Sequence, residues 1–111
     1  MNFYSDEKEW KWLFKNAIDW DKLLPLFYPV YPTEDGFESK QEVMEFLEEL
    51  LVSTGDWAGK SIAARAERLD REGAGKIENG RTIPGEALSE LYREATELSI
   101  FGVTLPRKYG G

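Results

Sequence analysis

The side chains of this chain that could do acid–base or metal chemistry are mainly carboxylates, because the sequence contains no histidine and no cysteine. Without histidine, the usual general base near neutral pH, the common zinc ligand and the His-based catalytic triads are all missing. Without cysteine there is no thiolate nucleophile, no disulfide framework and no thiolate metal site. Acid–base catalysis or metal binding would therefore depend on Asp and Glu.

Four glutamates, Glu42, Glu45, Glu48 and Glu49, fall within one segment of helical periodicity. A buried pair of carboxylates three residues apart on a helix can bridge a metal ion or share a proton. These four lie opposite the apolar stripe of the same segment, which indicates a solvated face. No histidine completes a Glu-x-x-His pattern, so a small metal-carboxylate bundle is disfavoured. We expect no catalytic residue and no metal ligand here.

A glycine-rich stretch, residues 73–80, could be mistaken for a phosphate cradle. Its Gly73-x-Gly75-Lys76 pattern lacks the Ser or Thr that follows the lysine in such loops, and no strand is expected before it. The segment predicts a surface loop, with a tight turn at Asn79-Gly80. We expect no cofactor-binding residue in the chain.

The elements around these residues all show helical signals. A capping-box pattern from Asp6 to Glu9 predicts a helix over about 6–18. An apolar patch follows that Pro25 interrupts, and residues 29–36 form a connector. A second capping-box pattern, from Ser39 to Glu42, starts the best-supported helix.

Further helices follow in the second half of the chain. Gly55 either breaks the helix that starts at Ser39 or bends one that runs on to about residue 70. The charged surface formed by Arg65, Arg68, Arg71 and their acidic neighbours is typical of a solvated helix face. Another helix begins near Pro84 and ends at Gly102 in a left-handed conformation, with an extended stretch over 103–106.

No strand is expected, so the predicted fold class is all-α, a small bundle of about four to five helices. The 111 residues, 41% of them hydrophobic, suffice for one domain or part of one. The expected core residues are Val43, Phe46, Leu47, Leu50, Leu88, Leu91, Ala95 and Leu98.

Charge and hydropathy exclude several classes of partner. The formal net charge is −7, and the acidity lies in the first two-thirds of the chain, which disfavours nucleic acid. No segment approaches the roughly 18 apolar residues of a membrane span, and acidic residues stand where a signal peptide would be basic. A soluble, cytoplasmic protein is the expectation.

Aromatic residues are concentrated near the N-terminus, where residues 1–31 hold nine of the 15. A helix with Trp on more than one face cannot hide every ring against one neighbour. We therefore favour contact with another domain or subunit over packing within this chain. The nine are Phe3, Tyr4, Trp10, Trp12, Phe14, Trp20, Phe27, Tyr28 and Tyr31.

From Ser39 onward, the order of elements and several short motifs resemble the N-terminal helical domain of the acyl-CoA dehydrogenases. The most specific match is the segment 102–111, Gly-Val-Thr-Leu-Pro-Arg-Lys-Tyr-Gly-Gly, and a second is Asp-Arg-Glu-Gly at 70–73. The loop 73–81 is similar to that of longer family members with an N-terminal extension. Where the family commonly has proline after an Ile-Ala pair, this chain has Ala64. The signature positions, structural in role, are Asp70, Gly73, Gly102, Pro106, Tyr109, Gly110 and Gly111.

The resemblance implies two regions, an aromatic extension over 1–37 and part of the family domain over 38–111. The parent would be a flavoprotein oxidoreductase of fatty acid metabolism that binds FAD and removes hydrogens from the α and β carbons of an acyl-CoA. The catalytic glutamate and most of the flavin site would lie outside this segment, so its role would be scaffolding. Its partners would be the remaining domains of the parent.

Two other classes of function remain open. A complete helical protein–protein interaction module would use the aromatic N-terminus to grip a partner. A fragment should instead expose apolar surface and self-associate, which separates the two hypotheses. A metal-carboxylate bundle would require metal-dependent melting.

Overall fold

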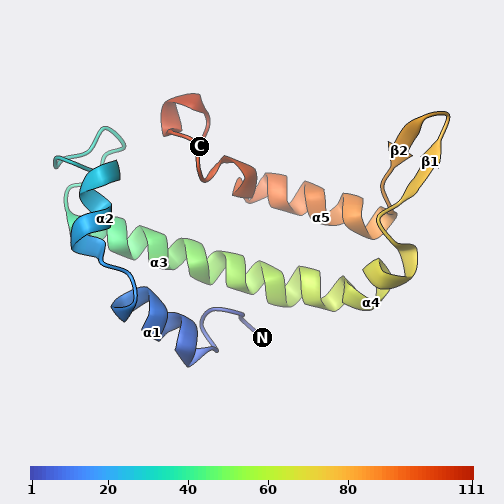
Figure 1. Ribbon diagram of the computed structural model, residues 1–111, viewed down its shortest axis with the longest axis horizontal. Helices are drawn as coiled ribbons and strands as arrows, with labels where there is room; N and C mark the ends of the chain where they lie inside the picture. The colour runs from blue at the N-terminus through green and yellow to red at the C-terminus, as the bar shows by residue number, and fades with distance from the viewer. The chain divides into compact units, whose positions relative to one another are not determined.

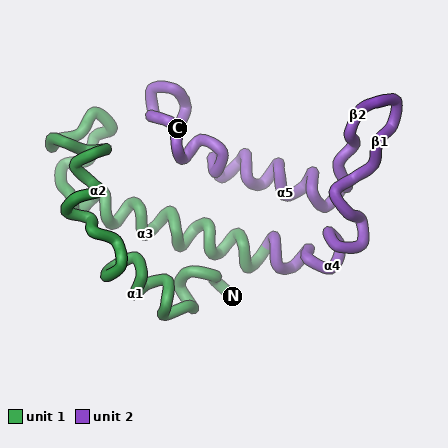
Figure 2. Tube along the Cα trace, in the orientation of Figure 1, with its two compact units in different colours: residues 1–60 green, residues 61–111 purple.

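The computed structural model describes all residues, 1–111, and the chain is mostly helical with one small two-stranded sheet (Figure 1). The chain divides into two compact units, residues 1–60 and residues 61–111 (Figure 2). The helical prediction is confirmed, whereas the expectation that no strand forms is wrong.

The first unit contains α1 (Lys8–Asn16), α2 (Trp20–Phe27) and α3 (Lys40–Trp57). The helix α3 begins where the sequence predicts, because the Ser39 side chain accepts a hydrogen bond from the Glu42 backbone N–H at 3.3 Å. The Glu42 carboxylate reaches back one residue further than in a capping box and accepts from the Glu38 N–H at 2.8 Å.

The helix α3 runs past Gly55 without a break and passes into a π-helical turn, η1 (Ala58–Ile62), which leads to α4 in the second unit. Gly55 is buried, and its missing side chain leaves room for the N-terminal segment. Of the two alternatives that the sequence left open, a break at Gly55 is therefore not observed.

The helix α1 is shorter than the predicted 6–18 and lacks the predicted cap. The Asp6 carboxylate accepts from the Asn2 N–H at 2.8 Å, and Glu7, which precedes α1, makes no side-chain cap. Helix α2 is capped by Asp19, which accepts from the Lys22 N–H at 3.2 Å. Pro25 lies inside α2 and does not end it, contrary to the expected interruption.

Aromatic contacts join the helices of the first unit. The Phe14 ring packs on Trp20 with centroids 4.9 Å apart, and the Trp20 indole donates to the Phe14 carbonyl at 2.6 Å. A second group links Tyr28, Phe37 and Phe46. Phe46 is 39% exposed, so its predicted place in the core is wrong. Of the stripe that begins at Val43, only Val43 itself is fully buried.

The second unit contains α4 (Ala63–Glu72), β1 (Lys76–Glu78), β2 (Arg81–Ile83) and α5 (Glu86–Glu97). The strands form an antiparallel hairpin in which Glu78 pairs with Arg81. Its two-residue turn places Asn79 at φ 52° and Gly80 at φ 74°, as the Asn-Gly pair predicts. The strands were missed because three exposed residues each are too few to show alternation.

Helix α5 buries Ala87, Leu91 and Ala95, which are spaced four residues apart. Its end differs from the prediction, because Ser99 and not Gly102 adopts the left-handed conformation. Leu98 follows the last residue of α5 and is 46% exposed, so it does not belong to the core.

The chain then turns through two short 3-10 helices, η2 (Ile100–Gly102) and η3 (Arg107–Tyr109). The Leu105 N–H donates to the Gly102 carbonyl at 2.8 Å, so residues 103–105 form a turn and not the predicted extended stretch. A backbone hydrogen bond therefore closes a turn around Val103 and Thr104, where an extended stretch was expected.

Candidate functional site

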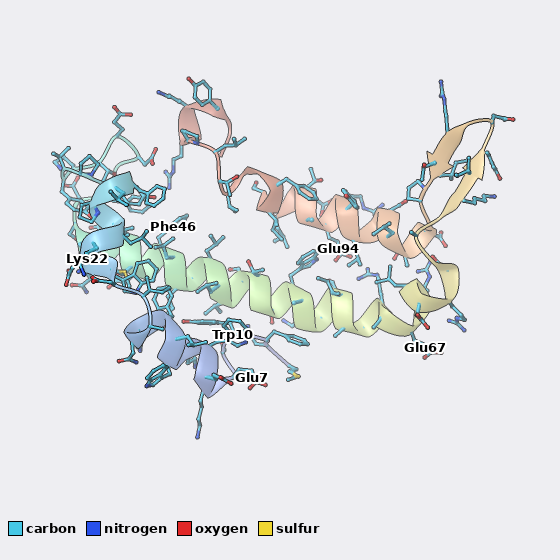
Figure 3. The ribbon with its side chains drawn as sticks, viewed as in Figure 1. Glu7, Trp10, Lys22, Phe46, Glu67 and Glu94 are labelled. Atoms are coloured by element: carbon cyan, nitrogen blue, oxygen red, sulfur yellow. The ribbon has the colours of Figure 1, made fainter.

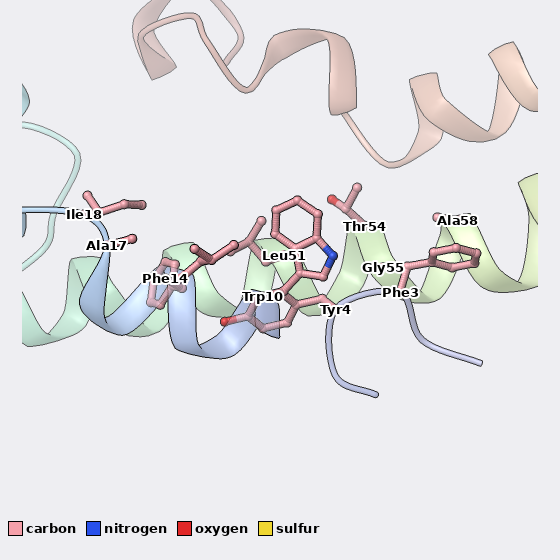
Figure 4. Close-up of a pocket in the computed structure, with 11 residues that line it drawn as sticks. Phe3, Tyr4, Trp10, Phe14, Ala17, Ile18, Leu51, Thr54, Gly55 and Ala58 are labelled. Carbon is pink, nitrogen blue, oxygen red and sulfur yellow. The ribbon is translucent and has the colours of Figure 1, made fainter. Parts of the chain in front are cut away.

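An apolar groove of about 560 Å³ is the candidate site, and all of it lies within the first unit (Figure 4). Three segments form it: the N-terminal residues before α1, one face of α1, and the second half of α3 with the turn after it. The lining residues are Phe3, Tyr4, Trp10, Leu13, Phe14, Ala17, Ile18, Leu51, Thr54, Gly55 and Ala58.

The spacing of the lining residues explains why they share one surface. In α1 and the residue after it, they recur at positions i, i+3, i+4 and i+7 from Trp10 to Ala17, which is one face of a helix. The same spacing runs along α3 and the first residue of η1, from Leu51 to Ala58. Two apolar faces thus form the walls of one groove.

The N-terminal segment closes one end of the groove by binding to the backbone of α3. The Phe3 N–H donates to the Gly55 carbonyl at 3.1 Å, and the Asn2 side-chain amide donates to the Val52 carbonyl at 2.9 Å. A Cβ on Gly55 would stand 2.5 Å from the Asn2 side-chain oxygen, and one on Gly59 would overlap the Met1 carbonyl. The close approach therefore depends on glycine at both positions.

Two hydroxyls reach the groove, and both already have partners. The Tyr4 hydroxyl donates to the Glu48 carboxylate at 3.1 Å, and the Thr54 hydroxyl donates to the Leu50 carbonyl at 2.8 Å. Burial, followed by the hydrogen bond to Glu48, raises the pKa of Tyr4 above its ordinary value. Tyr4 is therefore held as a neutral donor and has no role as a base at neutral pH.

The groove is open to solvent, since Trp10 is 57% exposed, Phe3 44% and Leu51 38%. Figure 4 shows Trp10 projecting from α1 beside Leu51 and Tyr4. An open groove whose lining is almost wholly apolar can bind an apolar surface. Its lining offers no acid–base pair and no nucleophile with an activating base.

The predicted N-terminal aromatic surface is brought together only in part. Four of the nine aromatics, Phe3, Tyr4, Trp10 and Phe14, line the groove. Trp12 lies on another face of α1 and is 60% exposed. The sequence missed the α3 wall of the groove, although the small residues Gly55, Ala58 and Gly59 were a usable signal for close approach.

The acidic residues of α3 form no metal site, and no group of three or more ligating side chains is found in the chain. Glu45 accepts from the Gln41 amide at 2.8 Å, and Glu48 holds Tyr4. In the other unit, the glycine-rich residues 73–75 lead into the hairpin, and a Cβ on Gly75 would overlap the Ile83 carbonyl. Gly75 therefore allows the close approach of the Ile83 backbone in the hairpin.

The charged surface of α4 is a cluster of ion pairs, most of them with α5, which the sequence did not predict. Arg65 contacts Glu90 at 3.0 Å and Glu94 at 2.6 Å, and Arg68 contacts Glu72 at 2.6 Å and Glu90 at 3.2 Å. Hydrogen bonds from Arg65 and then Arg68 lower the pKa of the Glu90 carboxyl. The cluster joins the two helices, and we assign it no chemistry.

The seven signature positions lie in the second unit, outside the groove. Asp70 is exposed in α4, and Gly73 follows α4 at φ 66°. The other five fall within the C-terminal turn, where the Gly111 N–H donates to the Pro106 carbonyl at 3.3 Å. A Cβ on Gly102 would lie 3.0 Å from the Gly110 carbonyl oxygen, so the turn packs glycine against glycine.

None of the chain's helices is long and apolar enough to cross a bilayer. Comparison of the chain with protein-family models, with curated proteins and with solved structures found no match.

Proposed function

We propose that this chain is the N-terminal helical part of an FAD-dependent acyl-CoA dehydrogenase and acts there as a scaffold without catalysing the reaction itself. The support from sequence is the motif resemblance at residues 70–73 and 102–111. The mostly helical structure agrees with the implied fold class. In the parent enzyme, acyl-CoA would be oxidised by groups that other segments supply.

The observation that carries the proposal is the balance of buried and exposed apolar side chains. Seven hydrophobic residues are buried, whereas 22 large hydrophobic residues are at least 37% exposed. Single exposed apolar residues are ordinary, but this many, with a groove among them, favour a surface that further protein covers. A scaffold segment of a larger enzyme would have its exposed apolar surface covered by the other segments of that enzyme.

The groove residues do not fit a flavin. The ribityl hydroxyls and diphosphate of FAD need several hydrogen-bond donors, and the two groove hydroxyls, of Tyr4 and Thr54, already donate within the chain. Nor does the groove contain a cationic side chain. The proposal accordingly assigns no cofactor-binding or catalytic residue to this chain.

The test is to determine the gene sequence that follows the codon for Gly111 and to express the complete product. We expect a strand-rich segment, a second helical region, bound flavin with its yellow absorbance, and bleaching of that absorbance by an acyl-CoA. Residues 1–111 alone should bind no flavin, which is the matched control. A stop codon after Gly111, or a complete product without flavin, would contradict the proposal.

The open groove favours a second candidate, a small helical interaction module whose groove receives another protein. The two candidates differ in solution behaviour. An isolated part of an enzyme should self-associate through its exposed apolar residues, whereas an interaction module should be monomeric in the absence of its partner. Sedimentation velocity of residues 1–111 over a hundredfold range of concentration distinguishes them.

A further inference from the structure

We propose that the groove between α1 and α3 is a docking site for a basic amphipathic helix of a partner protein. The inference concerns residues 1–60 and does not depend on the proposed dehydrogenase function. It follows from the shape of the groove, from the charge of the unit that contains it, and from the exposure of one tryptophan.

The shape fits a helix. Each wall contributes one helical face of two turns, and seven residues along a helix axis correspond to about 10 Å. A third helix that lies between two such walls would present apolar residues at i, i+3, i+4 and i+7, over about two turns. The walls of a pocket that fully encloses a small ligand are buried. The walls of this groove are not, because Trp10 and Leu51 are exposed.

The charge of this unit selects a basic partner. Residues 1–60 contain thirteen Asp and Glu and six Lys and Arg, so they carry the entire net charge of −7, while residues 61–111 are neutral. Opposite charges around an apolar contact select partners and accelerate association. A helix with lysine or arginine beside its apolar face meets this condition.

Most of the charges nearest the groove are negative. Asp6 and Glu7 are exposed just before α1. Figure 3 shows the side chains of Glu7 and Trp10 in this part of the chain. Glu48 is bonded to the groove residue Tyr4. By the helical period, Lys8 and Lys15 lie on the side of α1 away from the groove-lining residues, whereas Lys11, three residues before Phe14, lies at one edge of the groove. Carboxylates therefore outnumber lysine at the border of the groove.

The same charges argue against two other occupants. An anionic membrane surface would be repelled by this unit, and surface-binding helices normally have a Lys- and Arg-rich polar face. A second copy of the chain would bring the same carboxylates to the same groove, and like charges at an interface disfavour association.

The test is fluorescence anisotropy with residues 1–111 and a labelled fourteen-residue peptide of leucine and lysine, with leucine at the helical spacing. Two control peptides replace every lysine by glutamate or scramble the leucine positions. We expect saturable one-to-one binding of the basic helix, at least tenfold weaker binding of both controls, and weakening of the basic complex by added salt.

Two tryptophans of α1 provide a matched pair of variants. Trp10 lines the groove and is 57% exposed, whereas Trp12 lies outside it and is 60% exposed. We expect Trp10→Ala to weaken peptide binding at least tenfold and Trp12→Ala to change it less than twofold, with unchanged circular dichroism in both. If Trp10→Ala alters the helical spectrum, Leu51→Ser takes its place as the groove variant.

Four results would overturn the proposal. These are equal binding of the acidic and basic peptides, equal loss with both tryptophan variants, stronger binding to phosphatidylglycerol vesicles than to the basic peptide, and dimerisation of the chain that Trp10→Ala abolishes. The last two would assign the groove to a membrane surface or to a second copy.

Discussion

The Glu72 carboxylate, in the last turn of α4, accepts a hydrogen bond from the Ala87 backbone N–H in the first turn of α5 at 2.9 Å. The residue before α5, Gly85, has no side chain and cannot cap the helix. Glu72 thus supplies from another helix the acceptor that an N-cap residue normally provides, and its charge favours the same helix end. Arg68 holds the other Glu72 oxygen at 2.6 Å.

Replacing Glu72 by alanine should destabilise the second unit, because it removes the acceptor for Ala87 and a partner of Arg68. Glu72→Gln should have a smaller effect, since its amide oxygen still accepts from Ala87 while the charge is lost. The measurement is urea unfolding followed by circular dichroism. Glu67→Ala, at an exposed position of the same helix, is the control and should leave the midpoint unchanged. Equal midpoints for Glu72→Ala and Glu67→Ala would contradict the capping role.

The stability of the second unit should fall at acidic pH. The hydrogen bond from Ala87 and then the one from Arg68 lower the pKa of Glu72 below its ordinary value of 4.5, and Arg65 and Arg68 do the same for Glu90. The stabilisation is present above the ordinary pKa and is lost as the pH falls through the lowered pKa of the folded state, because the unfolded chain then binds more protons.

The measurement for this pH effect is the urea midpoint between about pH 6 and about pH 3, where the two protonation states exchange. The double variant Glu72→Gln/Glu90→Gln should show a smaller decrease of the urea midpoint with falling pH than the unsubstituted protein, since neither glutamine titrates. Parallel curves for the two proteins would show that these carboxylates are not the cause.

Local signals in the sequence predicted the parts of the fold that short-range chemistry decides. The Ser39 cap fixed the start of α3, and the Asn79-Gly80 pair fixed the hairpin turn. Both depend on the conformational preference of one or two residues and on contacts within four residues, so no tertiary information is needed.

The remaining features depend on contacts between residues distant in sequence. Asp6 does not cap α1, because its carboxylate accepts from the Asn2 N–H, and Phe46 is 39% exposed although its ring packs on Phe37. The groove needs Phe3 to meet Gly55 across more than fifty residues. The aromatic content indicated a contact surface, but the second wall could not be found from periodicity alone.

Leu91→Asp should unfold the second unit. Leu91 is 7% exposed on the buried face of α5, and an unpaired carboxylate placed there costs several kcal/mol. Thermal melting followed by circular dichroism measures the loss. Ser89→Asp adds the same charge to an exposed position of the same helix and should leave the melting curve almost unchanged. A Leu91→Asp protein with unchanged helicity and melting would remove Leu91 from the core.

Gly55→Ala should release the N-terminal segment from α3. A Cβ at this position would stand 2.7 Å from the Tyr4 backbone nitrogen, and overpacking of this kind costs about 1–3 kcal/mol. Alanine in the middle of a helix gains about 1 kcal/mol over glycine, which offsets the cost only in part. Helix α3 should therefore survive while the hydrogen bond from the Phe3 N–H to Gly55 breaks.

Amide hydrogen exchange measures this release, because the Phe3 N–H is protected only while the segment is docked. We expect exchange at Phe3 to accelerate at least tenfold in Gly55→Ala, together with loss of peptide binding to the groove that the segment closes. Ser53→Ala, two positions earlier on the exposed side of α3, favours the helix without approaching the segment and should leave Phe3 protected. Unchanged exchange at Phe3 in Gly55→Ala would mean that the segment does not require the glycine, and the account of how the groove is closed would be wrong.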